Sequence, residues 1–294
     1  MSTASQLPTI HRSRMTSLLL DYAELIKLRV TTLIVMTAWC GYFFASRKVQ
    51  LVSSGTAALN EVMERDVDAR MRRTASRPLP TGRMSLLHAA FAGVLLTVGG
   101  SLYLGAFANP LTGWLTFLTS VVYLGAYTPL KRFSSVCTFV GAFPGAMPGV
   151  LGWTAARGRL EWGTLILFGI LFLWQFPHFF SIAWLYREDY AQGGVRMLPV
   201  VEPQGRSTAV RIVLYSTLLL PVSLLPSFSG MSGRAYLAGA LMLGFGLLWM
   251  GARLAMLRMP LTSAVSKLRA RQLLQATIVY LPVLFLLMMT DCRL

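Results

Sequence analysis

The stretch "WGTLILFGILFLWQFPHFFSIAWLY" occupies residues 162–186 and contains no Asp, Glu, Lys or Arg. A membrane-spanning helix needs about 20 predominantly apolar residues, because each residue adds ~1.5 Å and the hydrocarbon core is ~30 Å thick. A helix of this length on the surface of a soluble protein would carry charged residues along one face. The stretch therefore predicts a helix that spans a membrane.

Apolar runs of the same kind recur along the chain. They lie at 30–46, 86–108, 111–130, 136–156, 212–229, 235–252 and 272–290, with a weaker run at 51–63. The 294 residues are 55% hydrophobic and 13% charged, whereas about a quarter of the residues of a soluble domain carry charge. We predict an all-α polytopic membrane protein, with a polar tail at 1–24 and a single domain at 25–294.

The basic residues border the apolar runs. Of the 27 Lys and Arg residues, 21 fall in alternate connections counted from the N-terminus, and the formal net charge is +16. The positive-inside rule then places the N-terminus in the cytoplasm, and the charge indicates contact with the lipid bilayer rather than with nucleic acid. We expect a bacterial inner membrane. The mitochondrial inner membrane is the less favoured alternative.

The run at 51–63 is too short for the crossing that this alternation requires. Only ten weakly apolar residues, "LVSSGTAALN" at 51–60, precede the acids. At ~1.5 Å per residue they cannot span a ~30 Å core. Either the segment enters the membrane partway within the protein, or the chain lacks residues that a complete one would have.

The stretch "NEVMERDVD" at 60–68 gathers four of the eleven acids. Asn60, Glu64 and Asp68 are spaced i, i+4, i+8, so a helix places them on one face over roughly 12 Å. Carboxylates at this spacing repel each other, and a cation between them removes the repulsion. Such oxygen ligands suit Mg²⁺, which commonly joins one or two carboxylates to substrate phosphates.

A solvated helix end held by salt bridges is the alternative interpretation of this stretch. The sequence allows three pairs at i, i+4, namely Glu61–Arg65, Asp66–Arg70 and Asp68–Arg72.

A second acidic loop weakens that alternative. "REDYAQGGVRMLPVVE" at 187–202 carries three more acids, and the charge count places it on the same side as the first loop. Two acidic clusters facing one cavity would hold two Mg²⁺ ions on a diphosphate, and nearby cations would neutralise the remaining charge. Those cations are Arg72, Arg73, Arg77, Lys131 and Arg132. A diphosphate beside an apolar cavity predicts a prenyl diphosphate, whose allylic cation aromatic rings would stabilise.

Six motifs then resemble a known family. In order, they are "NEVMERDVD", "RTASRPLPTG", "YTPLKR", "GAFPGAMPGVLGW", "QFPHFFSIAW" and "REDYAQGGVRMLPV". They are similar to those of protohaem IX farnesyltransferases (haem O synthases) in the UbiA-type prenyltransferase superfamily, as is "LIKLRVTTLIVMTAWCGYF" at 25–43.

The resemblance covers roughly residues 25–290. It implies about nine helices around a membrane cavity, of which the second would here be unusually short. It also implies Mg²⁺-dependent transfer of a farnesyl group from farnesyl diphosphate to a vinyl group of haem B, which yields haem O and diphosphate. Contact with haem A synthase or a terminal oxidase assembly is a further expectation.

Site residues follow from the matched motifs. The resemblance implies that Asn60, Glu64, Asp68 and Asp189 are catalytic, and that Glu64, Asp68, Asp66 and Asp189 hold the metal. Diphosphate would be bound by Arg72, Arg77, Lys131 and Arg132. Lys27 borders the first span, where it is either a membrane anchor or a further diphosphate contact. The superfamily often has D-x-x-x-D in the second loop, but Gly193 stands four residues after Asp189.

His178 lies in the apolar run at 162–186. Asp189 follows eleven residues later, which on an uninterrupted helix is three turns and about 20° away, so both would point the same way. We expect His178 to bind haem; a hydrogen bond inside the bundle, near Pro177, is the alternative. Gly141, Gly145 and Gly149, spaced at four, predict close helix packing.

Two other functions compete with haem farnesylation. One is a different aromatic prenyltransferase, acting on a quinone precursor or chlorophyllide. The other is a membrane transporter with the acidic loops as a cation entry, which predicts polar groups at the bilayer midplane. The acids of this chain cluster at one membrane face, which favours surface diphosphate chemistry.

Overall fold

The computed structural model describes residues 21, 22, 24, 37, 40 and 41, and residues 55–293 apart from 203 and 258–260. This part of the chain is helical, without a β-strand; one isolated bridge joins Ser232 and Cys292. The helices are α3 (Gly55–Arg70), α4 (Leu86–Phe107), α5 (Pro110–Val122), η1 (Tyr123–Tyr127, a π-helix), α6 (Thr128–Leu130), α7 (Cys137–Arg157), α8 (Trp162–Leu185), α9 (Arg187–Gln192), α10 (Leu198–Val201), α11 (Arg206–Phe228), α12 (Arg234–Ala255) and α13 (Ala264–Thr290).

The all-α membrane architecture predicted from the apolar runs is confirmed. Within the described residues, five helices are long and apolar enough to cross a membrane: α4, α8, α11, α12 and α13. Helix α7 has 21 residues, and α5, η1 and α6 follow one another without a break over residues 110–130. The total of nine spans stays a prediction, because the first apolar run lies largely outside the described residues.

Polar residues at the ends of the apolar runs fix where helices begin. The side chains of Ser85, Asn109 and Ser263 accept hydrogen bonds from backbone N–H groups in the first turns of α4, α5 and α13. Helix α8 begins with a capping box between Glu161 and Thr164. Each cap satisfies an N–H group that would otherwise lack a partner at the helix start.

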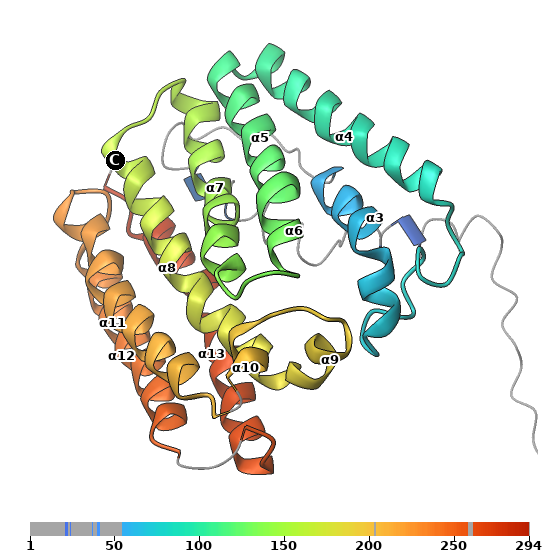
Figure 1. Ribbon diagram of the computed structural model, residues 1–294. Coiled ribbons are helices and arrows are strands. Elements are labelled where there is room, and N and C mark those ends of the chain that lie inside the picture. Colours follow the sequence, from blue (N-terminus) through green and yellow to red (C-terminus); the bar gives the residue numbers. More distant parts are fainter. Residues whose placement is uncertain are drawn as a thin grey trace, which may run out of the picture.

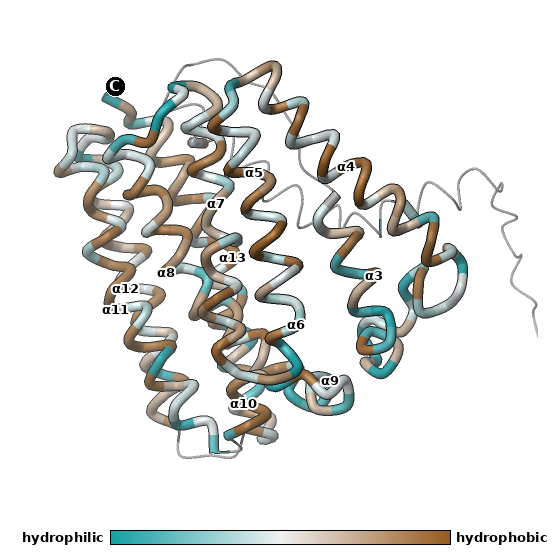
Figure 2. Tube along the Cα trace, turned by 45° about the horizontal axis from the view of Figure 1, so that its top comes forward, coloured by the Kyte–Doolittle hydropathy of each residue, from teal (hydrophilic) through white to brown (hydrophobic). Residues whose placement is uncertain are grey.

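Helix α8 lies at the centre of the bundle and packs against α7, α11 and α13 (Figure 1). Over half of its apolar stretch, 56%, is buried, compared with 17% for α4. Among the described helices, α4 packs mainly against α3 and α5, and it exposes side chains such as Leu87 and Phe91. Figure 2 shows apolar residues along the outer helices, as expected of a surface that faces lipid.

The glycines of α7 allow the close packing that their spacing predicted. A Cβ at Gly141 would come within 2.5 Å of the Tyr127 ring, and one at Gly145 would overlap the Gln175 amide. Pro144 and Pro148 lie inside the same helix.

The connections between helices gather at two opposite ends of the molecule. The end of α3, the loop after α6 and the short helices α9 and α10 lie together, and the C-terminus lies at the far end (Figure 1). Arg83, which follows α3, pairs with Asp21 just before the first apolar run. At the opposite end, Asn109 donates to the Thr154 carbonyl. The connections between the described helices thus alternate between the two ends, as the distribution of basic residues predicted.

Candidate functional site

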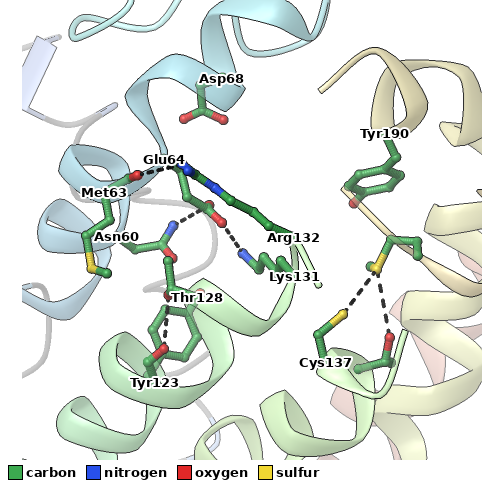
Figure 3. Close-up of polar contacts among 12 residues, drawn as sticks. Asn60, Met63, Glu64, Asp68, Tyr123, Thr128, Lys131, Arg132, Cys137 and Tyr190 are labelled. Carbon is green, nitrogen blue, oxygen red and sulfur yellow. Dashed lines mark hydrogen bonds and ion pairs between the residues drawn. The ribbon is translucent and has the colours of Figure 1, made fainter. Parts of the chain in front are cut away.

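The face of α3 predicted from spacing is present. The Asn60 amide nitrogen donates to Glu64 Oε2 at 2.8 Å, and Thr128 Oγ1 donates to Asn60 Oδ1 at 3.0 Å (Figure 3). Asn60 and Asp68 are almost fully buried. Buried polar groups of this kind are costly unless they are hydrogen-bonded or paired. Helix α3 therefore presents its polar face to the protein interior.

Lys131 joins this face from the loop after α6. Its Nζ lies 2.7 Å from Glu64 Oε1 and 4.3 Å from the centre of the Tyr127 ring. Burial alone would lower the pKa of Lys131, but Tyr127, Tyr123 and Glu64 outweigh burial and raise that pKa well above its ordinary value. Lys131 therefore carries a permanent positive charge at physiological pH.

Arg77 supplies a second cation. Its Nη1 lies 2.7 Å from Asp68 Oδ2, and its Nε lies 3.6 Å from Glu61 Oε1. Burial alone would lower the pKa of Arg77, but Asp68 and Glu61 raise it further above the usual value. The loop is held in place because Thr74 Oγ1 donates to the Asp68 carbonyl at 2.9 Å.

These contacts overturn the solvated-helix interpretation of residues 60–68. Glu61 and Asp68 are buried, and Asp68 pairs with Arg77 rather than with Arg72. Asp66 differs from them: its side chain is exposed, and Arg70 contacts its backbone carbonyl instead. The structure brings Asn60, Glu64 and Asp68 together and leaves Asp66 outside the group.

The second acidic loop meets the first. Helix α8 ends at Leu185, and α9 begins at Arg187. Asp189 is 8% exposed, and its Oδ1 lies 3.7 Å from Arg72 Nε. Arg73 donates to the Tyr190 hydroxyl at 2.7 Å. The convergence of the two loops predicted from sequence is confirmed.

A hollow of about 430 Å³ lies where the two loops meet. It is lined by Arg72, Arg73, Leu185, Tyr186, Glu188 and Asp189. Arg73 also lies over the Tyr186 ring, 4.9 Å from its centre. The hollow thus combines two guanidinium groups with two carboxylates, a set that suits an anion bound together with a cation.

Arg132 and Lys27 are the two further cations predicted from sequence. Arg132 Nη2 donates to the Met63 carbonyl at 3.3 Å, so its side chain reaches across to α3 (Figure 3). Lys27 lies outside the described residues.

His178 makes the hydrogen bond that was the alternative to haem contact. Its Nδ1 lies 2.9 Å from Thr277 Oγ1 on α13, and its ring stacks on Trp174 with centres 4.7 Å apart. The predicted alignment of His178 with Asp189 assumed one continuous helix, which the structure does not have. Tyr186, with φ −105° and ψ 25°, ends α8 between the two residues.

Sequence reasoning missed several residues of the site. Glu61 entered only the alternative interpretation, as a surface pair with Arg65, yet it is 1% exposed and faces Arg77. Its position seven residues before Asp68 places both on the same helix face and could have indicated this. Thr128 and Tyr190 gave no such signal, because their contacts join segments far apart in the chain.

The donor set fits a magnesium ion that is completed by its substrate. In the part of the chain that the structure describes, no three His, Cys, Asp or Glu side chains gather closely enough to hold a metal alone. Mg²⁺ commonly binds through one or two carboxylates, with substrate phosphates and waters filling the other positions. Glu64 and Asp68 on one face, beside Lys131 and Arg77, match that requirement.

Solved structures define the class of fold. A structure from a study of digeranylgeranylglyceryl phosphate synthase matches with a TM-score of 0.74 at 17% identity, covering 93% of this chain and 98% of that one. A UbiA homologue from Archaeoglobus fulgidus, bound to GPP and Mg²⁺, matches with a TM-score of 0.62 at 13% identity, covering 91% and 99%. The fold is therefore that of UbiA-type membrane proteins.

The chain belongs to the UbiA prenyltransferase family, whose model matches residues 15–288. A protohaem IX farnesyltransferase of Koribacter versatilis (strain Ellin345) is 54% identical over 307 positions, which cover 99% of each chain. The family resemblance predicted from the six motifs is thus confirmed.

The same alignment is longer than the chain. It runs over 307 positions, whereas the chain has 294 residues. At least 13 positions of the relative therefore have no counterpart in this chain.

Proposed function

We propose that this protein transfers a farnesyl group from farnesyl diphosphate to a vinyl group of haem B, giving haem O and diphosphate. The observation that carries the proposal is the convergence of Glu64 and Asp68 with Lys131 and Arg77 at one end of an apolar helical bundle. The name of the 54% identical relative favours haem over a quinone precursor or chlorophyllide, and over transport.

The acids of the two loops hold the metal in this proposal. Glu64 and Asp68 on α3 would hold Mg²⁺ together with the diphosphate, with Asn60 fixing Glu64 through its 2.8 Å hydrogen bond, and Asp189 would reach the metal–diphosphate unit from the second loop. When bound, Mg²⁺ would neutralise the charge that develops on the departing diphosphate. We leave Asp66 out of this set, because its side chain is exposed and apart from the others.

The cations bind the diphosphate in this proposal. Lys131 and Arg77 lie beside the α3 carboxylates, Arg72 lies beside Asp189, and Arg132 reaches α3 from the same loop as Lys131. Lys27 remains a proposed contact from outside the described residues. Charge-assisted bonds to phosphate oxygens are among the stronger polar contacts in proteins.

The bond changes follow from the chemistry of the two substrates. The allylic C–O bond breaks, and its electron pair leaves with the diphosphate. The vinyl π electrons of haem B then form the new C–C bond, and water adds to the resulting cation and releases a proton. Tyr123 and Tyr127, whose rings lie 5.0 Å apart next to the polar site, would stabilise the allylic cation through their faces.

His178 is the proposed haem contact. The Thr277 hydroxyl forms a hydrogen bond with Nδ1 of the ring. Proteins commonly orient one ring nitrogen toward a metal by fixing the other in this way. We therefore assign Nε2 as the atom that faces haem.

The proposed location is a bacterial inner membrane, with the N-terminus and the polar site on the cytoplasmic side. The excess of Lys and Arg at the site end supports this orientation. Haem O leaves such a site inside the bilayer, so a haem A synthase or a terminal oxidase assembly is the expected receiving partner.

A transfer assay tests the proposal. Membranes containing the full chain would be incubated with labelled farnesyl diphosphate and haem B, with and without Mg²⁺, and the products identified by mass. The wild type should form haem O only with Mg²⁺. Combined Glu64→Gln and Asp68→Asn should lower the rate by at least about 100-fold, in the range found when transition-state charge stabilisation is removed.

Asp66→Asn is the matched control, since it removes an exposed carboxylate from the same helix. It should retain most of the activity. A double variant as active as Asp66→Asn would refute the metal assignment. Farnesylation of a quinone precursor without haem O would instead refute the assigned acceptor.

A further inference from the structure

A second hollow lies apart from the polar site, among α7, α8 and α11. Its volume is about 250 Å³, and its lining includes Ser135, Thr138, Phe139, Phe176, Arg211 and Tyr215. None of these residues belongs to the proposed catalytic set. The hollow is therefore separate from the proposed catalytic site.

The apolar wall of the hollow continues along the helices. Phe176 and Tyr215 stack with ring centres 3.7 Å apart, and Phe139 lies 6.2 Å from Phe176. Phe172 contacts Phe139 at 5.7 Å and Phe143 at 5.0 Å. We call Phe139, Phe143, Phe168, Phe172 and Phe176 the aromatic seam.

The α7 side of the aromatic seam is open to the surroundings of the bundle. Phe139 and Phe143 on α7 are 43% and 45% exposed, whereas Phe176 on α8 is buried against Tyr215 of α11. In a membrane-embedded chain such a surface meets acyl chains rather than water. An occupant of the seam therefore has a long apolar chain.

The polar end of the hollow carries a cation. Arg211, in the second turn of α11, is exposed and has no ion-pair partner among the described residues. Ser135 lies in the loop after α6, four residues beyond Lys131 of the polar site. The cationic end of the hollow is thus at the end of the molecule where basic residues gather, which is the depth of lipid head groups.

We propose that this hollow binds one anionic phospholipid. Its phosphate contacts the Arg211 guanidinium and the Ser135 hydroxyl, and one acyl chain follows the aromatic seam. A single cation complements a single negative phosphate, whereas a prenyl diphosphate carries more charge and requires the acids and several cations of the polar site. The proposal does not rest on the proposed function, because it concerns binding alone.

Native mass spectrometry of the purified full chain tests this proposal. Phosphatidylglycerol and phosphatidylcholine with identical acyl chains would be titrated separately, and retained lipids counted per chain. The wild type should retain one phosphatidylglycerol in preference to phosphatidylcholine. Arg211→Gln should weaken this binding about fivefold, the effect expected of one basic residue near a lipid head group.

Arg206→Gln is the matched control, because Arg206 is an exposed arginine in the first turn of the same helix and does not line the hollow. It should bind like the wild type. Ser135→Trp, which fills the hollow and keeps Arg211, should also lose the lipid. Equal loss in both arginine variants, equal retention of the two lipids, or displacement by farnesyl diphosphate would each overturn the proposal.

Discussion

At the scale of residues, the acids and cations of the polar site pair with one another. Glu64 lies against Lys131, Asp68 against Arg77, and Asp189 against Arg72. Charges that are partly buried are costly without a partner. When a metal–diphosphate unit binds, the carboxylates would turn from the cations to the metal, and the cations would turn from the carboxylates to the phosphate. The site can thus fill without leaving an unpaired charge.

Residue spacing predicted part of this site. The shared face of Asn60, Glu64 and Asp68 follows from the helical period alone. The contact between Arg73 and Tyr190 spans 117 positions, and that between His178 and Thr277 spans 99. Contacts of that kind depend on how helices pack, which no local pattern encodes.

The role of His178 can be tested against its hydrogen-bond partner. His178→Ala should weaken haem binding by about 10-fold or more, and Thr277→Val should weaken it less, because the ring stays but loses its orienting bond. Haem titration followed by the Soret absorbance measures both. Farnesyl diphosphate binding should be unchanged in both variants and serves as the control. Wild-type haem affinity in His178→Ala would contradict the assignment.

At the scale of elements, apolar runs located α4, α7, α8 and α12 to within three residues at each end. Helices α11 and α13 begin six and eight residues before their runs, in segments that carry arginine or lysine. The run predicted at 136–156 is α7 at Cys137–Arg157. The run at 111–130 is instead divided into α5, η1 and α6, because a π-turn changes hydrogen bonding without changing apolar composition. The short helices α9 and α10 had no periodic signal, and the break at Tyr186 separates Asp189 from α8.

The close approach of α7 and α8 can be tested at Gly145. A Cβ there would overlap the Gln175 amide, whose nitrogen donates to the carbonyls of Ala142 and Leu171. Gly145→Ala should destabilise the protein by about 1–3 kcal/mol, the usual cost of overpacking. Thermal unfolding in detergent measures this.

Gly99→Ala on α4 is the control, since a Cβ at Gly99 meets nothing within 4 Å. It should leave the protein as stable or slightly more stable, because Ala favours helix over Gly. If Gly145→Ala unfolded at the same temperature as Gly99→Ala, the packing of α7 against α8 would be different from that described.

At the scale of the whole molecule, composition and charge predicted a helical membrane protein with a basic end, but not which helix lies at the centre. All the spans are apolar on several sides, so hydrophobicity does not distinguish a face toward lipid from a face toward another helix. Small residues gave the better signal: of the three spaced glycines of α7, Gly145 and Gly149 face the central helix α8, and Gly141 faces Tyr127.

The apolar run of the second span, at 51–63, is shorter than a membrane crossing requires. The described part of this span is helix α3, Gly55–Arg70, whose 16 residues are ~24 Å long. The same helix carries Asn60, Glu64 and Asp68 of the polar site. The alignment with the Koribacter relative contains at least 13 positions without a counterpart in this chain. We infer that these positions belong to the second span, just before α3, because the only run too short to cross lies there.

Restoring the span tests this inference. The matching residues of the relative would be inserted between Gln50 and Leu51, and the control would carry a Gly/Ser segment of equal length at the same point. The apolar insertion should raise the midpoint of thermal unfolding in detergent by several degrees and raise haem O formation, because a complete helix would anchor the amino end of α3 across the bilayer. The Gly/Ser segment cannot cross hydrocarbon and should produce neither effect. If the two insertions behaved alike, the gap would have to lie elsewhere in the chain, and 51–63 would be a segment that enters the membrane partway with its polar backbone groups satisfied inside the protein.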